Sequence, residues 1–350
     1  MEKSYSDHIY EILEVAEGNP IFKDLLLNLF FNNLPESVSR NIKKTLDTYK
    51  LKPRAKSGWH CQHRGCQEIS CASHEISENS VLKNISSLDS NVVILKRDIK
   101  NNPIYYVEGI QHKRNATNFP GYCSKHDALL FSDIDSSDTP FDIHYVNKQC
   151  LRTTRAQIFE MDFQIKACNI FINDVPEEIR GDEEVKEVVS NFNNKKAILE
   201  SKRQRLWCVY NEIFDGIESK KYALNFKSFP PAAVGFCFSA CIDLTMSEDK
   251  DACILYPCKL DIKSSSETFI AYLDNDVSKD TSDWFARSHQ IRFGQLMYEL
   301  KSKLILSEHF ASIIPEDVKE ILYKDDELYK VGPVEHYFIS RVFFSTPTHP

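Results

Sequence analysis

The stretch Trp59-His60-Cys61-Gln62-His63-Arg64-Gly65-Cys66 contains two cysteines, spaced Cys61-x4-Cys66, around a glycine. It is typical of a strand that turns through Gly65 and directs both thiols inward. Much later in the chain, Cys123 and His126 form a second close pair. Two short pairs of thiol and imidazole ligands that are distant in sequence suit a tetrahedral structural Zn(II) site. The sequence therefore predicts zinc bound by Cys61, Cys66, Cys123 and His126.

The second pair is expected at the start of a helix. A loop over residues 119–122 ends at Cys123, and apolar positions then recur with helical spacing to Phe131. Cys123 and His126, three positions apart, would share one face of the first turn. A knuckle followed by a helix start is a treble-clef-like layout. His60 and His63 are substitute ligands if His126 is not the fourth ligand.

Composition narrows the class of protein. The chain has 350 residues, 11 cysteines and a formal net charge of −8, so several folded units are expected. With no signal-like start and no apolar run of membrane-spanning length, we expect a cytoplasmic protein with no membrane partner and with thiols rather than disulfides. An acidic chain must bind nucleic acid through a local basic surface, for which the candidates are residues 52–56, 112–114 and 202–205.

The pattern along the chain predicts an α+β protein in four parts. Residues 1–50 are expected to form N-terminal helices, and residues 51–146 a zinc-finger module with strands at 92–95 and 104–107. Residues 147–220 are expected to form a helical hairpin. Residues 221–350 are expected to form an α+β recognition or assembly domain, since strand-like runs at 232–238, 253–256 and 268–272 precede helical runs near 290–300 and 318–323.

The hairpin prediction rests on two apolar stripes. The first recurs by steps of three and four and the second by steps of seven: Leu151, Thr154, Ile158, Met161, Ile165, Cys168 and Ile172, then Val185, Phe192, Leu199, Leu206 and Ile213. Two such helices can pair within one chain or form a seam between subunits. Both alternatives are open from the sequence.

A resemblance to a known family rests on residues 60–131. Cys61-x4-Cys66, then Ser73-His74-Glu75-Ile76, then residues 115–127 with Cys123 and His126, resemble the zinc-finger segment of a group of bacterial proteins linked to phage defence. Within that group the chain is similar to the ring-activated zinc-finger RNase type. The resemblance implies a latent ribonuclease that assembles into a homo-oligomeric ring and is triggered by a phage protein.

The same order of residues also resembles zinc-containing HNH nucleases. Carried over by position, His74 matches the catalytic histidine, Asn115 or Asn118 the central asparagine, and Asp127 the residue just after the second zinc pair. That resemblance would imply a second divalent metal. The chain departs from it in having Ser73 before His74 and about 48 residues between His74 and Cys123.

For RNA cleavage a second metal is unnecessary, because the 2′-hydroxyl is an internal nucleophile. A neutral histidine can accept its proton, and a cation can stabilise the charge that develops on phosphorus-bound oxygen. We expect His74 to be the base and Arg114 or Lys125 the cation. His74 can alternatively be a zinc ligand or a polar residue that fixes the knuckle.

Two arginines on the predicted hairpin, Arg152 and Arg155, could face the same cleft or could be exposed charges. The function expected from the sequence is a zinc-finger endoribonuclease with RNA as its substrate. The alternatives are a non-catalytic zinc-finger protein that binds RNA or protein, and a DNA-cutting HNH endonuclease.

Overall fold

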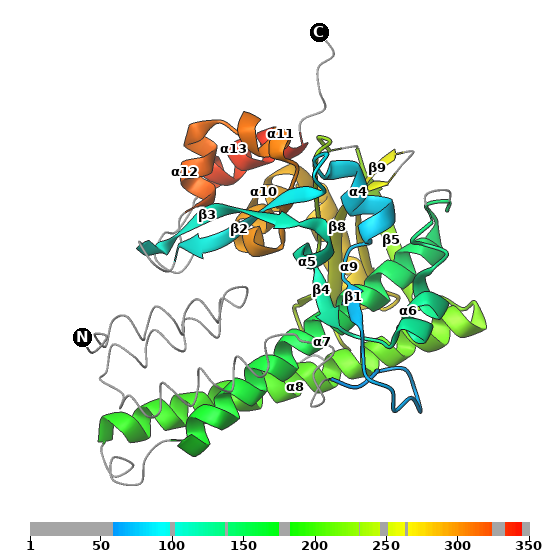
Figure 1. The fold of residues 1–350 in the computed structure, drawn as a ribbon, viewed down its shortest axis with the longest axis vertical. Coiled ribbons are helices and arrows are strands. Elements are labelled where there is room, and N and C mark those ends of the chain that lie inside the picture. The colour runs from blue at the N-terminus through cyan, green and yellow to red at the C-terminus, as the bar shows by residue number, and fades with distance from the viewer. Residues whose placement is uncertain are drawn as a thin grey trace.

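The structure is a computed structural model that describes residues 59–98, 102–136, 139–174, 183–230, 232–245, 251–262, 265–323 and 333–344 (Figure 1). The helices expected over residues 1–50 and the basic segment at 52–56 lie outside these residues. The described part is a mixed α+β fold with one pair of long helices, as the sequence predicts. None of its helices is both long enough and apolar enough to cross a membrane.

A large antiparallel sheet organises the described residues. Its strands follow the order β3-β2-β10-β6-β8-β9-β5, and β7 pairs with β8. Their bounds are β2 Asn91–Asp98, β3 Asn102–His112, β5 Leu224–Phe229, β6 Phe236–Ser239, β7 Ile242–Asp243, β8 Ile254–Ile262, β9 Ser265–Leu273 and β10 Ile305–Leu306. The strands expected near 92–95, 104–107, 232–238, 253–256 and 268–272 are all present, as β2, β3, β6, β8 and β9.

Both faces of this sheet are covered by helices. Successive side chains of a strand point to opposite faces, so each central strand contributes to two apolar cores. On β8 and β9, Tyr256 and Phe269 belong to the apolar core on the side of the long helices, whereas Leu255 and Ile270 belong to a second core with the C-terminal helices. All four side chains are buried. The central part of these strands is therefore buried on both faces, which is why its sequence shows no simple polar alternation. The charged residues Lys259 and Asp261 of β8 are buried as well and form an ion pair with each other.

Two long helices, α7 (Ile143–Asp174) and α8 (Glu183–Ser219), run side by side and cover one face of the sheet (Figure 1). The stripe residues Leu151, Ile158, Leu206 and Ile213 are each 0% exposed in this single chain. The hairpin prediction is confirmed, and the seam lies within one chain. These apolar stripes are consequently not free to join subunits.

Short helices cover the opposite face. They are α9 Asp276–Arg287, α10 His289–Glu299, a 3₁₀ turn at Lys301–Lys303, α11 Glu308–Ile313, α12 Glu316–Leu322 and α13 Pro333–Phe344. Phe293 of α10 and Phe343 of α13 are both fully buried in the core that they share. The helices expected near 290–300 and 318–323 correspond to α10 and α12.

The predicted zinc module contributes to two sheets. Its strands β1 (Ala72–His74) and β4 (Asn118–Pro120) pair antiparallel, and the helix α6 (Ser124–Phe131) follows. Between β1 and β4 the chain forms a π-helical turn (Glu78–Leu82), α4 (Lys83–Ile85), the strands β2 and β3, and α5 (Lys113–Ala116). Because β2 pairs with β10 in the large sheet, residues of the predicted module and of the predicted C-terminal domain share one sheet.

Candidate metal centre and its surroundings

The first ligand pair lies on a tight turn. Gly65 has a φ of 74°, a left-handed conformation that glycine adopts without strain. The amide of Cys61 donates to the Glu68 carbonyl at 2.8 Å, and the amide of Cys66 donates to the His63 carbonyl at 3.1 Å. The turn therefore brings the two thiols to the same side, as expected for a knuckle.

The second pair lies at the start of α6. Cys123 is the N-cap residue of this helix, and His126 follows in its first turn. The Sγ of Cys123 lies 3.3 Å from Nδ1 of His126, the Sγ of Cys61 lies 3.5 Å from the same nitrogen, and the sulfurs of Cys66 and Cys123 are 4.0 Å apart. The predicted four residues thus converge from two distant segments.

The donor set fits a metal ion. The ligand atoms of Cys61, Cys66, Cys123 and His126 all lie within 4.8 Å of one another, so the cluster could hold an ion such as zinc. Three thiols and an imidazole are donors that suit tetrahedral zinc. Burial raises the pKa of the Cys61 thiol to about 11, so metal binding there would have to displace a proton.

The two substitute histidines are not part of this cluster. His60 Nδ1 bonds to the Gln67 carbonyl at 3.1 Å, while the His63 ring stacks on the His126 ring with centroids 3.9 Å apart. The knuckle is also fixed to α8, because Arg64 donates to Asp215 at 2.6 Å. His63 therefore orients a ligand ring and is not itself placed as a ligand.

The pairing of β1 with β4 brings His74 to this module. In register, Ser73 is opposite Phe119 and His74 is opposite Asn118. The amide of Tyr122 donates to the Ser73 hydroxyl at 3.1 Å. The strand that ends at His74 is thus tied to the loop from which α6 begins.

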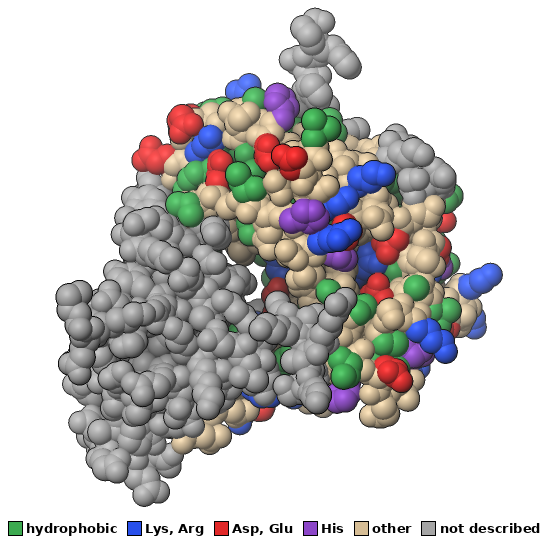
Figure 2. Space-filling view, in the orientation of Figure 1, with side chains coloured by type: hydrophobic (Ala, Val, Ile, Leu, Met, Phe, Trp, Pro, Cys, Tyr) green, Lys and Arg blue, Asp and Glu red, His purple; other side chains and the backbone are tan. Residues whose placement is uncertain are grey.

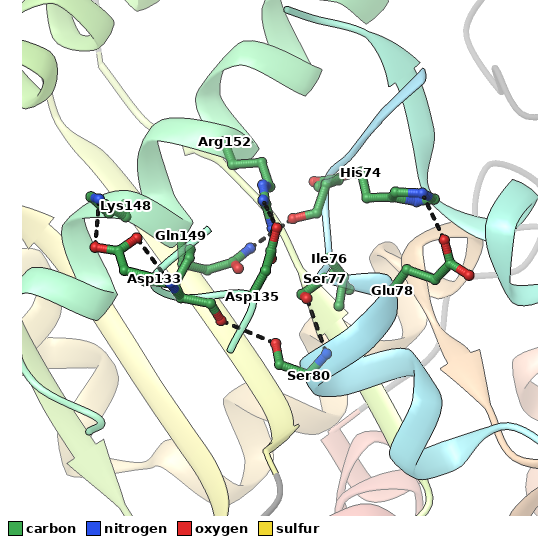
Figure 3. A network of polar contacts seen from close by, with 12 residues as sticks. His74, Ile76, Ser77, Glu78, Ser80, Asp133, Asp135, Lys148, Gln149 and Arg152 are labelled. Atoms are coloured by element: carbon green, nitrogen blue, oxygen red, sulfur yellow. Dashed lines mark hydrogen bonds and ion pairs between the residues drawn. The ribbon is translucent and has the colours of Figure 1, made fainter. Parts of the chain in front are cut away.

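His74 lies apart from the metal cluster, beside Glu78 (Figure 3). Its Nε2 is 3.4 Å from a carboxylate oxygen of Glu78, and its Nδ1 is buried with no hydrogen-bond partner. Burial lowers the pKa of His74 below its ordinary value, and the Glu78 carboxylate only partly offsets this effect. The imidazole is therefore neutral near pH 7, the state in which it can accept a proton.

Glu78 also forms ion pairs with two basic residues of α5. Its Oε1 lies 3.5 Å from Nε of Arg114 and 3.9 Å from Nζ of Lys113. The Arg114 side chain is 75% exposed, so its guanidinium remains available to a ligand. Figure 2 shows a group of basic and histidine side chains in the middle of the face that it presents. In Figure 1, which has the same orientation, this region holds α4 and α5.

The two predicted site residues on α6 differ in placement. Asp127 has a buried Oδ1 without a hydrogen-bond partner, and its charge acts on His74. Lys125 is exposed, and its charge acts on the ligand His126. Asp127 is therefore brought into the surroundings of His74, whereas the described contacts give Lys125 no role there.

Arg152 and Arg155 of α7 are not surface charges, since they are 1% and 0% exposed. Arg152 forms a bidentate pair with Asp135, at 3.0 and 2.9 Å, in the middle of the network in Figure 3. Its charge also acts on His74. Arg155 has no hydrogen-bond partner for any of its three nitrogens.

Sequence reasoning missed Glu78 and Asp135. Glu78 lies four positions after His74, and Ser77 before it caps the turn by accepting from the Ser80 amide. His74 ends β1 and Glu78 begins the turn after it, so their proximity depends on the bend between the strand and the turn and not on a helical repeat. Asp135 gave no signal either, since its partner Arg152 reaches it only through the tertiary fold.

No protein-family model matches this chain, and no match to it is found among the curated proteins or the solved structures.

Proposed function

We propose that this chain is a zinc-finger endoribonuclease of bacterial antiphage defence, in which Cys61, Cys66, Cys123 and His126 hold a structural zinc and His74 is the general base. The observation that carries the proposal is the position of His74 at the end of β1. There a neutral imidazole with one unpartnered nitrogen contacts Glu78, whose other carboxylate oxygen contacts the exposed Arg114, and the strand of His74 is tied to the loop before α6.

The chemistry requires only residues of the chain and the RNA itself. His74 accepts the proton of a 2′-hydroxyl, the 2′-oxygen attacks the adjacent phosphorus, and the bond from phosphorus to the 5′-oxygen breaks. The leaving oxygen takes a proton from water, which gives a 2′,3′-cyclic phosphate and a 5′-hydroxyl. Arg114 would stabilise the negative charge on the phosphoryl oxygens in the transition state.

Glu78 would have the role of orienting the base. A carboxylate beside Nε2 favours the tautomer in which Nε2 carries the proton and Nδ1 has the free lone pair. This Nδ1 is buried, so a substrate hydroxyl reaches it only after a local movement. A base that is covered in the resting chain is consistent with a latent enzyme that a phage protein activates.

Ring assembly belongs to the proposal but needs a surface other than the α7–α8 seam. A ring would place the basic groups around α5 of several subunits side by side and raise the local concentration of phosphate-binding sites for RNA. This would compensate for the net charge of −8 on each chain.

A DNA-cutting HNH endonuclease is the second candidate, and the unpartnered Oδ1 of Asp127 favours it. A carboxylate oxygen is a donor that Mg(II) prefers, and its charge already acts on His74. In that case Asp127 would hold the second divalent metal and His74 would activate water.

Purified protein incubated with separate RNA and DNA substrates, with EDTA or with added Mg(II), distinguishes these functions. Each reaction is repeated with lysate of phage-infected cells to supply a trigger, with lysate alone as the control. RNA cleavage that survives EDTA supports the proposal, whereas DNA cleavage that needs Mg(II) supports the HNH candidate. RNA binding with no cleavage under any condition would contradict both and indicate a non-catalytic zinc-finger protein.

A further inference from the structure

A second cluster of titratable side chains includes Asp133, at the end of the network in Figure 3 that lies away from His74. Asp133 follows α6, His144 lies in the first turn of α7, and Tyr222 follows α8. Nδ1 of His144 lies 3.0 Å from the Tyr222 hydroxyl, and Nε2 of His144 lies 2.9 Å from Oδ2 of Asp133. A phenol, an imidazole and a carboxylate from three separate segments therefore form one continuous chain of hydrogen bonds.

The contacts of Asp133 fix where the proton of the imidazole lies. Nζ of Lys148 donates to Oδ2 of Asp133 at 2.6 Å, and the Ile134 amide donates to Oδ1 at 2.9 Å. Partial burial would raise the pKa of Asp133, but the hydrogen bonds from Lys148 and His144 outweigh burial and the pKa is lowered. An ionised carboxylate has no proton to donate, so in the neutral imidazole Nε2 carries the hydrogen and Nδ1 accepts from the Tyr222 hydroxyl.

This order of groups is the one that activates a nucleophile. A hydroxyl that donates to a base, with the base held in one tautomer by a carboxylate, loses its proton as it attacks an electrophile. The His144 side chain is 32% exposed and Tyr222 is half-buried, so the pair lies at the surface of the described residues. A small molecule can therefore approach the phenol without unfolding the chain.

The charges beside Tyr222 indicate the class of electrophile. Lys220 and Lys221 directly precede Tyr222 and are both exposed, against one exposed acidic residue, Glu218, at the end of α8. The charge of Asp133 is already paired. A local excess of positive charge raises the concentration of anionic molecules near the phenol. Among electrophiles, this favours an activated phosphate.

We propose that Tyr222, His144 and Asp133 form a second reactive site, in which the phenol accepts a phosphoryl group from a small activated phosphate such as an acyl phosphate. The phenol oxygen forms a bond to phosphorus and the bond from phosphorus to the leaving carboxylate breaks. The phenol proton passes to Nδ1 of His144 and from there to water, while Asp133 stabilises the imidazolium. The inference makes no use of His74 or the metal centre, so it stands or fails independently of RNA cleavage.

Acetyl phosphate is the probe that tests the site in the full chain. Protein is incubated with it and digested, and phosphotyrosine is mapped by mass spectrometry over time. Tyr222 should be labelled about 10²- to 10⁴-fold faster in the wild type than in His144→Asn, the usual contribution of a general base. Tyr337, which is 42% exposed, is the internal control and should be labelled far more slowly than Tyr222. Equal labelling of the two tyrosines, no label on Tyr222, or an undiminished rate in His144→Asn would overturn the proposal.

The pH dependence of labelling in the wild type keeps the proposal testable if His144→Asn does not fold. An imidazole base predicts a rate that stops rising above about pH 8, since a histidine of ordinary pKa, about 6.5, is then neutral. A phenol that reacts without a base has an ordinary pKa of about 10, so its rate continues to rise to about pH 10. A plateau supports the site, and a continuous rise would overturn it even if Tyr222 is labelled.

Discussion

At the scale of single residues, two of the predicted site residues each have a buried polar atom without a hydrogen-bond partner, Nδ1 of His74 and Oδ1 of Asp127. Each such atom destabilises a fold by about 1–3 kcal/mol. His74 is the last residue of β1, and Asp127 lies in α6. The hydrogen bond from the Tyr122 amide to the Ser73 hydroxyl ties β1 to the loop from which α6 begins. The Asp127 charge acts on His74, and buried polar atoms without a protein partner are commonly satisfied by a bound water, ion or ligand.

Replacement of His74 by alanine tests its role as base. His74→Ala should reduce RNA cleavage by about 10²- to 10⁴-fold, the contribution typical of a general base. Zinc content should be unchanged, because His74 is outside the metal cluster. The matched control is His60→Ala, since the exposed side chain of His60 contacts the Gln67 carbonyl through Nδ1 and lies outside the metal cluster. Loss of zinc in His74→Ala, or full activity, would refute the assignment.

The four cluster residues could be predicted from the sequence because each ligand pair is local. Two ligands that are a few residues apart in sequence can reach one metal ion if the chain between them forms either a tight turn or the first turn of a helix. The burial of Arg152 and Arg155 could not be predicted, because the sequence shows two arginines three positions apart without showing what covers them. Burial of a charge depends on which distant groups compensate for it.

At the scale of elements, the knuckle and α6 depend on each other through the metal. Cys123→Ser should lose about one equivalent of zinc and lower the unfolding temperature, because binding energy of a structural site is folding energy. Cys208→Ser, at an exposed cysteine of α8, is the control and should behave as wild type. Metal analysis with thermal unfolding measures both effects. A zinc-free Cys123→Ser protein with wild-type stability would show that the site has no structural role.

The α7–α8 pair gives a second prediction at this scale. Leu206 is 0% exposed and Ile198, on the same helix, is 58% exposed. Leu206→Ala should reduce the free energy of unfolding by about 2–5 kcal/mol, since it leaves a cavity in the core. Ile198→Ala should change it by less than about 0.5 kcal/mol. Urea denaturation of both variants checks this, and equal small effects would contradict the packing described for the seam.

The types of the longer elements follow from sequence patterns, but the order of strands does not. Heptad stripes predicted α7 and α8, and β-branched and aromatic runs predicted β8 and β9. The strand β10 has only two residues, Ile305 and Leu306, yet it lies between β6 and β2 and pairs Ile305 with Ile94, which is far away in the sequence. A pair of apolar residues carries no periodicity, so this link between the module and the sheet was not predictable.

At the scale of the whole molecule, one ion cluster ties the strand of His74 to the C-terminal half. Lys303 contacts Glu75 at 3.2 Å and also pairs with Glu160 of α7. Glu75 is buried, and burial raises its pKa from an ordinary value of 4.5 to about 7. The neighbouring Lys303 cation opposes this effect only in part, and the Glu160 carboxylate adds to it.

This cluster predicts a pH dependence of stability. Between about pH 4.5 and 7 the folded chain keeps a proton on Glu75 that the unfolded chain releases, so stability falls as pH rises through this window. Glu75→Gln mimics the protonated form. It should match the wild type at pH 5 and exceed it at pH 8, by at most roughly 3 kcal/mol in the free energy of unfolding. Parallel stability curves for the two proteins between pH 5 and 8 would contradict the assignment.

The chemical ends of cleaved RNA test the central claim most directly. Wild-type protein, activated by lysate of phage-infected cells if it is silent alone, is incubated with end-labelled RNA in EDTA, and the products are separated and typed by phosphatase and kinase treatment. A histidine base acting on the 2′-hydroxyl predicts a 2′,3′-cyclic phosphate and a 5′-hydroxyl, both absent with His74→Ala. Products with a 5′-phosphate and a 3′-hydroxyl that form only when Mg(II) is added would contradict this account.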